Sequence, residues 1–169
     1  MSQSLIKHWP PIRRVFAAAL SSSFHLSVGS VDQDGNPHIS PIGSIHLDRN
    51  ETSGYYFELF TKQMPRNLQT NQRVCVMAVP SRMRQWFGAL LRGRFKTPPG
   101  VRLYGTAGEL RPATNKEVAR WHRKVKSLRF LKGHDLLWAN TSHVREIHFD
   151  GWAPVNLGPM TRGCWDTAP

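Results

Sequence analysis

Cysteine is scarce in this chain of 169 residues, where only Cys75 and Cys164 occur, far apart and without CxxC spacing. Two such cysteines do not build a disulfide framework, and they lack the paired spacing of a zinc site. The eight histidines show neither an HExxH pattern nor another paired metal-ligand spacing. We therefore expect a protein of a reducing, cytoplasmic compartment, without a metal site.

Long apolar runs are also missing, and none approaches the length that spans a membrane. The short stretch "RRVFAAAL" at 13–20 is followed directly by polar residues, which does not fit a signal peptide. Hydrophobic residues still make up 40% of the chain, enough for a globular core. We expect one domain over 1–169, with an N-terminal helical segment at 1–23, a C-terminal tail at 153–169, and no membrane partner.

Acidic residues are few, with 11 Asp and Glu against 23 Lys and Arg, and the net charge is +12. The excess is local, because residues 80–133 hold 14 basic side chains and only Glu109 and Glu117 as acids. Such a patch can meet nucleic acid, anionic lipid or a phosphorylated small molecule. It can equally be a solvated basic face that keeps the protein soluble.

Alternating apolar residues and turn residues predict six strands. The turn at 32–37 joins the first two strands as a hairpin, and the two glycines of "VRLYGTAGEL" suggest a bulge or a sharp bend in the fifth. Because the order is meander-like and shows no βαβ alternation, the pattern predicts a mainly β fold with some α-helix: a six-stranded antiparallel β-barrel with short flanking helices. The predicted strands are 24–31, 38–47, 55–60, 73–80, 101–110 and 143–152.

Helices are predicted at the N-terminus, where Pro11 lies in the first turn of "WPPIRRVFAAALSSS", and over about 114–131. In the second, Thr114 and Glu117 have capping-box spacing. An apolar stripe follows along that helix, made of Val118, Trp121, Val125 and Leu128.

The insert at 81–95 interrupts the predicted strands with "SRMRQWFGALLRGRF". Its apolar residues Trp86, Phe87, Leu90 and Leu91 form one face flanked by arginines. Such a face suits the core, a partner subunit, a pocket lid or a membrane surface. We rank core or dimer packing first.

Two stretches have residues suited to a cofactor. In "SPIGS" at 40–44, Pro and Gly are unusual for a central strand, and they would let a flat ligand lie against the backbone. An edge strand guarded by Pro41 explains the same residues equally well. Farther along, Pro65 opens a helical turn near Lys62 and Arg66, so free N–H groups and cations could bind phosphate there. A polar connector with two surface cations is the alternative.

The order of "DGNPHISPIG", an aromatic strand, "TKQMPRNLQTNQRVCV" and "VRLYGTAGEL" resembles the pyridoxamine 5′-phosphate oxidase-like family, the FMN-binding split barrels, over roughly 20–150. The resemblance implies a split barrel, FMN as cofactor, and a homodimer with flavin at the interface. It places four residues beside the flavin ring, namely Ser40, Pro41, Ile42 and Gly43. It places five at the phosphate, namely Thr61, Lys62, Gln63, Arg66 and Asn67.

Vitamin B6 oxidation is not implied, because this chain has Ser40 and Ile45 where pyridoxamine phosphate oxidases carry basic residues, and Gln63 and Met64 in place of a double-basic pair. We expect an FMN-dependent oxidoreductase acting on a small molecule, with unknown catalytic residues. The alternatives are a flavin- or haem-binding protein that stores or senses without turnover and, ranked last, a nucleic-acid binder that uses the basic region at 80–133.

Overall fold

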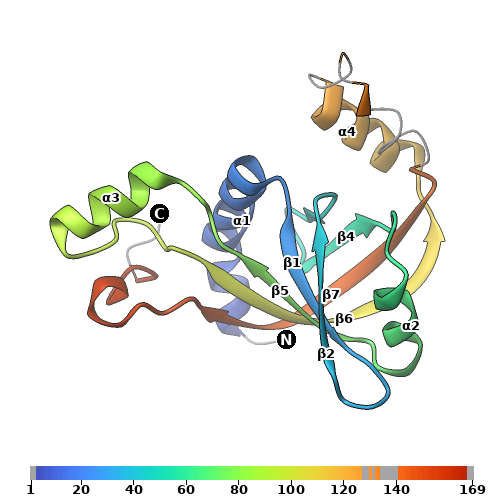
Figure 1. The fold of residues 1–169 in the computed structure, drawn as a ribbon, viewed down its shortest axis with the longest axis horizontal. Helices are drawn as coiled ribbons and strands as arrows, with labels where there is room; N and C mark the ends of the chain where they lie inside the picture. The colour runs from blue at the N-terminus through green and yellow to red at the C-terminus, as the bar shows by residue number, and fades with distance from the viewer. Residues whose placement is uncertain (1–2, 127–129, 131, 134–140, 167–169) are drawn as a thin grey trace.

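The computed structural model describes residues 3–126, 130, 132–133 and 141–166. Its centre is one antiparallel sheet of seven strands in the order β2-β1-β5-β6-β7-β4-β3, curled into a half-barrel (Figure 1). The predicted mainly β, antiparallel split-barrel fold is therefore confirmed. The strands are β1 Leu26–Val31, β2 Pro37–Ile42, β3 His46–Leu47, β4 Ser53–Phe57, β5 Arg73–Ala78, β6 Val101–Pro112 and β7 His143–Pro154. The helices are α1 Gln3–Ser23, α2 Gln63–Thr70, α3 Met83–Arg92 and α4 Asn115–Val125.

The strand expected over 38–47 is two strands, which is why seven are found instead of six. β2 pairs with β1 at one end of the sheet order, whereas β3 pairs with β4 at the other end. The link at 43–45 therefore joins the two edges of the curled sheet. Gly43 permits this crossing, because a Cβ built there would lie 2.6 Å from the carbonyl oxygen of Phe24.

α1 is longer than expected, so Pro10 and Pro11 lie inside it instead of at its start. The added turns are stabilised by burial of Leu5 and Trp9 against the inner face of the sheet. The Trp9 indole also donates a hydrogen bond of 3.0 Å to the carbonyl oxygen of Asp48. These contacts offset the helix hydrogen bonds that the two prolines cannot donate.

β6 and β7 are the two longest strands, and the predicted irregularity in β6 is confirmed. The register between them shifts at Tyr104/Gly105 and again between Ala107 and Leu110. At Gly105 a Cβ would lie 2.5 Å from the carbonyl oxygen of His148, so the close approach of the two strands requires glycine there. The shifts fit the bend of these strands around the barrel.

α4 begins as predicted, at a capping box in which Thr114 accepts from the Glu117 amide and Glu117 accepts from the Thr114 amide. Trp121 and Val125 of its apolar stripe are buried against Phe57 and Val144. Leu128, the last predicted member of the stripe, lies outside the described residues. The helix therefore packs beside the end of β4 and the start of β7, at one end of the sheet (Figure 1). Within the described part of the chain, no helix is long and apolar enough to cross a membrane.

Candidate functional site

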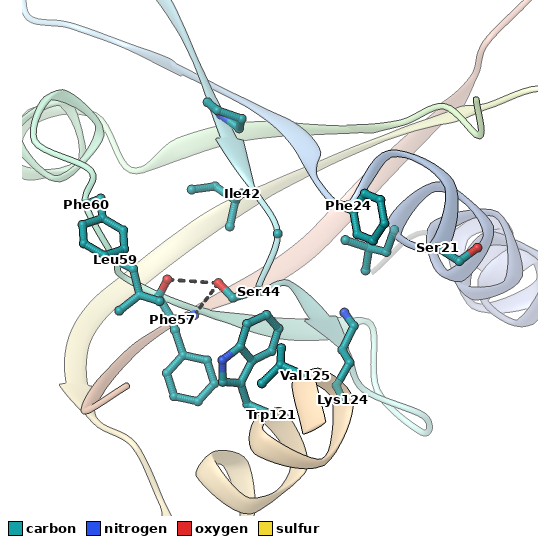
Figure 2. A pocket seen from close by; sticks show the side chains of 13 residues that line it. Ser21, Phe24, Ile42, Ser44, Phe57, Leu59, Phe60, Trp121, Lys124 and Val125 are labelled. Atoms are coloured by element: carbon teal, nitrogen blue, oxygen red, sulfur yellow. Dashed lines mark hydrogen bonds between the residues drawn. The ribbon is translucent and has the colours of Figure 1, made fainter. Parts of the chain in front are cut away.

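A pocket of about 500 Å³ opens where the end of α1, the end of β2, the segment after β4 and α4 meet (Figure 2). Its volume lies in the range of small-molecule sites. Most of its walls are apolar, and they come from segments that are distant in the sequence. The lining residues are Leu20, Ser21, Phe24, Pro41, Ile42, Gly43, Ser44, Phe57, Leu59, Phe60, Trp121, Lys124 and Val125.

Aromatic rings form one wall of the pocket. Trp121 of α4 packs on Phe57 of β4 with ring centroids 5.9 Å apart, and both side chains are buried. Ser44 holds the backbone of Phe57 in place, because its hydroxyl forms hydrogen bonds with both the amide and the carbonyl of Phe57 (Figure 2). The wall is therefore held in place by packing and by hydrogen bonds, which suits binding of a flat ring.

Lys124 brings positive charge to this apolar pocket. Its ammonium lies 5.4 Å from the centroid of the Trp121 ring, in a cation–π contact. Desolvation lowers the pKa of Lys124 from its ordinary value. A ligand with partial negative charge on one edge of a flat ring would therefore meet a favourable potential here.

Two phenylalanines at the pocket have unusual backbones. Phe24 and Phe60 both lie in the left-handed region, with φ of 62° and 58°, and both side chains are about three-quarters exposed, at 75% and 74%. For a bulky residue this conformation is strained, and such strain gathers at functional sites. Sequence reasoning missed both, since nothing in a phenylalanine or its neighbours signals a positive φ.

The predicted ring-binding residues lie partly at this pocket. Pro41, Ile42 and Gly43 line it, and Ser40 lies next to them on β2 without being part of the lining. Gly43 has no positive φ, and its lack of a side chain is already required by the Phe24 carbonyl. The close approach at this glycine is therefore one of backbone to backbone.

The residues predicted to bind the phosphate do not all line one hollow. Gln63, Arg66 and Asn67 line a second depression, beside Asp32 and Asp34 of the β1–β2 turn. Thr61 and Lys62 lie in the sequence between Phe60 of the pocket and Gln63 of the depression, and they line neither.

Asn67 has a structural role in the described chain. It is buried, donates a hydrogen bond of 3.0 Å to the Ser30 hydroxyl, and accepts one of 2.9 Å from the Gln63 amide. The bond to Ser30 fastens α2 to β1, and the bond from Gln63 lies within α2. Of the five predicted phosphate residues, Lys62, Gln63 and Arg66 are the exposed ones.

The start of α2 differs slightly from the prediction. The helix begins at Gln63, two residues before Pro65, and the N-cap residue Lys62 makes no side-chain capping bond. Thr61, directly before it, has a buried hydroxyl with no hydrogen-bond partner in the described chain. Uncapped amides, a cation and an unpartnered hydroxyl are a donor set that suits an anion.

The α4 wall of the pocket was also missed by sequence reasoning. Trp121 was predicted only as a member of an apolar helix stripe, and that prediction is correct locally. Lys124 follows Trp121 by three residues on the same helix. Their place at the pocket depends on how α4 packs against β4, which the helix's own sequence does not encode.

The sequence profile of the family described as pyridoxamine 5′-phosphate oxidase matches residues 12–149. A search of curated proteins gave no match.

Several solved structures share the fold at low identity. An FMN-binding protein from Syntrophomonas wolfei subsp. wolfei is 12% identical with a TM-score of 0.59, over 92% of this chain and 97% of that chain. HupZ from Group A Streptococcus is 18% identical with a TM-score of 0.57, over 88% and 94%. HutZ, the haem storage protein from Vibrio cholerae, is 14% identical with a TM-score of 0.56, over 86% and 92%.

Proposed function

Because the chain belongs to the pyridoxamine 5′-phosphate oxidase family, we propose that it is a flavoprotein that binds FMN and acts as an oxidoreductase on a small molecule. One observation carries the proposal: the largely apolar pocket of about 500 Å³ is lined by Pro41, Ile42 and Gly43. These are residues that the family resemblance assigns to the flavin ring. The fold and the sequence motif therefore both support this pocket as the flavin site.

The residues present fit a flavin. A flat ring system would lie against the Phe57–Trp121 wall, and Lys124 would favour partial negative charge on its edge. The unpartnered hydroxyl of Thr61 and the uncapped start of α2 would serve the phosphate, with Lys62 and Arg66 as cations. A bound flavin supplies hydride or single-electron transfer, while the protein sets its orientation and potential.

Haem is the alternative cofactor, since HutZ, which shares the fold, is named as a haem storage protein. The described residues that line the pocket include no His, Cys, Met or Tyr. Haem iron is held in proteins by side chains of these kinds. This lining therefore favours a flavin over haem in this pocket.

A second copy of the chain would complete the site. Phe24 and Phe60 expose most of their rings at the pocket, and apolar groups gathered at one place favour association. We include in the proposal a symmetric homodimer in which the partner covers these two rings. This arrangement would also exclude water from the pocket.

The test is the absorption spectrum of the purified protein, followed by titration of apoprotein with FMN and with haem. A flavin spectrum that is bleached by NAD(P)H supports the proposal, with turnover of small-molecule acceptors measured next. Flavin binding without reduction or turnover would favour a storage or sensing role. A haem spectrum alone would overturn FMN as the cofactor.

A matched pair of variants tests the location of the cofactor. Leu59→Trp adds bulk to the pocket lining, whereas Leu110→Trp adds the same bulk at a partly exposed site on β6, outside that lining. We expect the first variant to purify folded and colourless, and the second to keep its flavin. If folded Leu59→Trp retained its flavin, the cofactor would have to bind at a site other than this pocket.

A further inference from the structure

α3 has an apolar stripe that points away from the rest of the protein. Met83, Trp86, Phe87, Leu90 and Leu91 recur at the i, i+3, i+4, i+7 and i+8 spacing of one helix face. Four of them are between 66% and 81% exposed, the exception being Trp86 at 36%. The prediction that these residues share one helix face is confirmed. In the described chain that face is exposed to solvent, whereas packing in the core would have buried it.

The helix is attached through Ala89 and through Trp86, which lies at the edge of the stripe. Ala89 is its one fully buried residue and packs with Phe95 and with Cys164 of the C-terminal segment. The Trp86 ring meets the Phe95 ring edge-on, with centroids 5.2 Å apart. Gly93, with a φ of 66°, ends the helix. α3 therefore projects from the barrel with a defined orientation, at the end away from α4 (Figure 1).

The surroundings of the stripe are basic. Arg82, Arg84 and Arg92 lie on or directly before the helix, and Arg94 and Lys96 follow it. The sequence has no Asp or Glu between Glu58 and Glu109. A depression of about 550 Å³ beside the helix end is lined by Arg94, Lys96 and Arg162. The face therefore combines exposed apolar groups with cations that have no acidic neighbours in the local sequence.

We propose that α3 docks on an anionic lipid surface, with its apolar stripe in the boundary between head groups and acyl chains and its arginines among the lipid phosphates. A helix with an apolar stripe, basic flanks and low overall hydrophobicity lies in the plane of a membrane. Its 10 residues are far too few to span one. The flanking cations add attraction to anionic lipids.

Charge decides between a lipid surface and a second copy of the chain. A symmetric dimer through α3 would bring the same arginines of both copies together, and the sequence between Glu58 and Glu109 has no carboxylate to pair them. An anionic membrane offers the complementary charge. Nucleic acid would match the arginines, but it would leave the stripe of Met83, Phe87, Leu90 and Leu91 without an apolar partner. This inference replaces the expectation from sequence that the chain has no membrane partner, and it does not depend on the proposed flavin chemistry.

The test is co-sedimentation of the full chain with vesicles of phosphatidylcholine alone and of phosphatidylcholine mixed with phosphatidylglycerol. We expect binding to the mixed vesicles that weakens as salt is raised. Phe87→Ser/Leu91→Ser should weaken this binding at least roughly tenfold, because two apolar side chains no longer insert. Arg84→Glu/Arg92→Glu should weaken it by a similar factor.

Ile6→Ser is the matched control, because it removes an exposed apolar side chain of α1 that is not part of the α3 stripe, and it should bind as the parent does. Circular dichroism and melting temperature establish that every variant is folded. Absence of binding to the mixed vesicles would overturn the proposal, as would equal binding by the parent and folded Phe87→Ser/Leu91→Ser. A parent dimer that this variant converts to monomer, without vesicle binding, would assign the stripe to a second copy.

Discussion

On the β3 side of β4, the Ser44 hydroxyl takes the place of a backbone partner for Phe57. Its Oγ lies 3.1 Å from the carbonyl oxygen of Phe57 and 3.1 Å from the amide nitrogen, so it donates to one and accepts from the other. Both residues are buried. This pair connects the link between β2 and β3 to the end of β4, and it holds the aromatic wall of the pocket.

Ser44→Ala should lower the free energy of unfolding by about 1–3 kcal/mol, because buried backbone groups of Phe57 lose their partner. Chemical denaturation measures the change. Ser40→Ala, the same replacement four residues earlier on β2, should change stability by less than about 0.5 kcal/mol. Similar losses for the two variants would show that the Ser44 bonds contribute nothing specific.

Gly43→Ala should destabilise the fold by about 1–3 kcal/mol, since its Cβ would meet the Phe24 carbonyl oxygen at 2.6 Å. Gly29→Ala in β1 is the control, because the nearest atom to its Cβ is 3.6 Å away. Thermal melting of apoprotein separates this effect from cofactor loss. A Gly43→Ala protein that melts like the parent yet purifies colourless would reassign the glycine to the flavin.

Local pattern was sufficient for most strands, because alternation such as buried Leu26 and Val28 in β1 reflects the burial of one sheet face. The prediction from local pattern was wrong at 38–47, because there the chain passes from one edge of the sheet to the other without a turn sequence. The break between β2 and β3 depends on contacts of Gly43 with the Phe24 carbonyl and of Ser44 with the backbone of Phe57. In each contact the two residues are close in space but distant in the sequence.

The predictions of the start of the N-terminal helix and of the pocket walls fell short for similar reasons. Pro10 and Pro11 ordinarily mark a helix start, but burial of Leu5 and Trp9 extends the helix through them. Of the motif at 40–43, Pro41, Ile42 and Gly43 line the pocket. The contribution of Trp121 and Lys124 depends on tertiary packing, and a periodic stripe cannot distinguish a core wall from a ligand wall.

Arg66→Ala should weaken FMN binding by roughly tenfold while leaving riboflavin affinity unchanged, because a charge-assisted phosphate contact is worth about 1.5–3 kcal/mol. Flavin fluorescence titration of apoprotein measures both affinities. Arg49→Ala removes an exposed arginine outside both hollows and should alter neither. Equal losses for the two flavins would remove Arg66 from the phosphate role.

Acid should weaken the attachment of α4. Arg111 donates to Glu117 from its two terminal guanidinium nitrogens, at 2.8 and 3.0 Å, and this pairing, with the Thr114 cap, lowers the pKa of Glu117 to about 2. A carboxyl whose pKa is lower in the folded than in the unfolded chain stabilises the fold above its ordinary pKa. That contribution is lost as pH falls from near 4.5 towards 2.

Glu117→Gln should therefore cost about 1–2 kcal/mol near neutral pH, and the difference from the parent should shrink as pH falls below about 4. Denaturation at several pH values measures this trend. Glu109→Gln changes an exposed carboxyl on β6 and is the control. A difference between parent and Glu117→Gln that stays constant with pH would contradict the role of the ion pair.

The proposed dimer predicts that Phe24→Ser/Phe60→Ser sediments as a monomer at micromolar concentration while the parent sediments as a dimer. Both rings are mostly exposed in the single chain, so their removal should not unfold it. Phe87→Ser removes a ring of α3 that is also mostly exposed and should remain dimeric. A flavin-loaded parent monomer would argue against the dimer.

The pairing of β4 also bears on how the protein is made. β4 pairs with β3, which directly precedes it, and with β7, in a register that matches Ser53 to His148 and Phe57 to Val144. During synthesis the first hairpins leave the ribosome long before β7 does. The β3–β4 hairpin therefore cannot join the rest of the sheet until the segment at 143–154 has emerged, and until then α1 is the earliest element that can cover the apolar residues of β1 and β5.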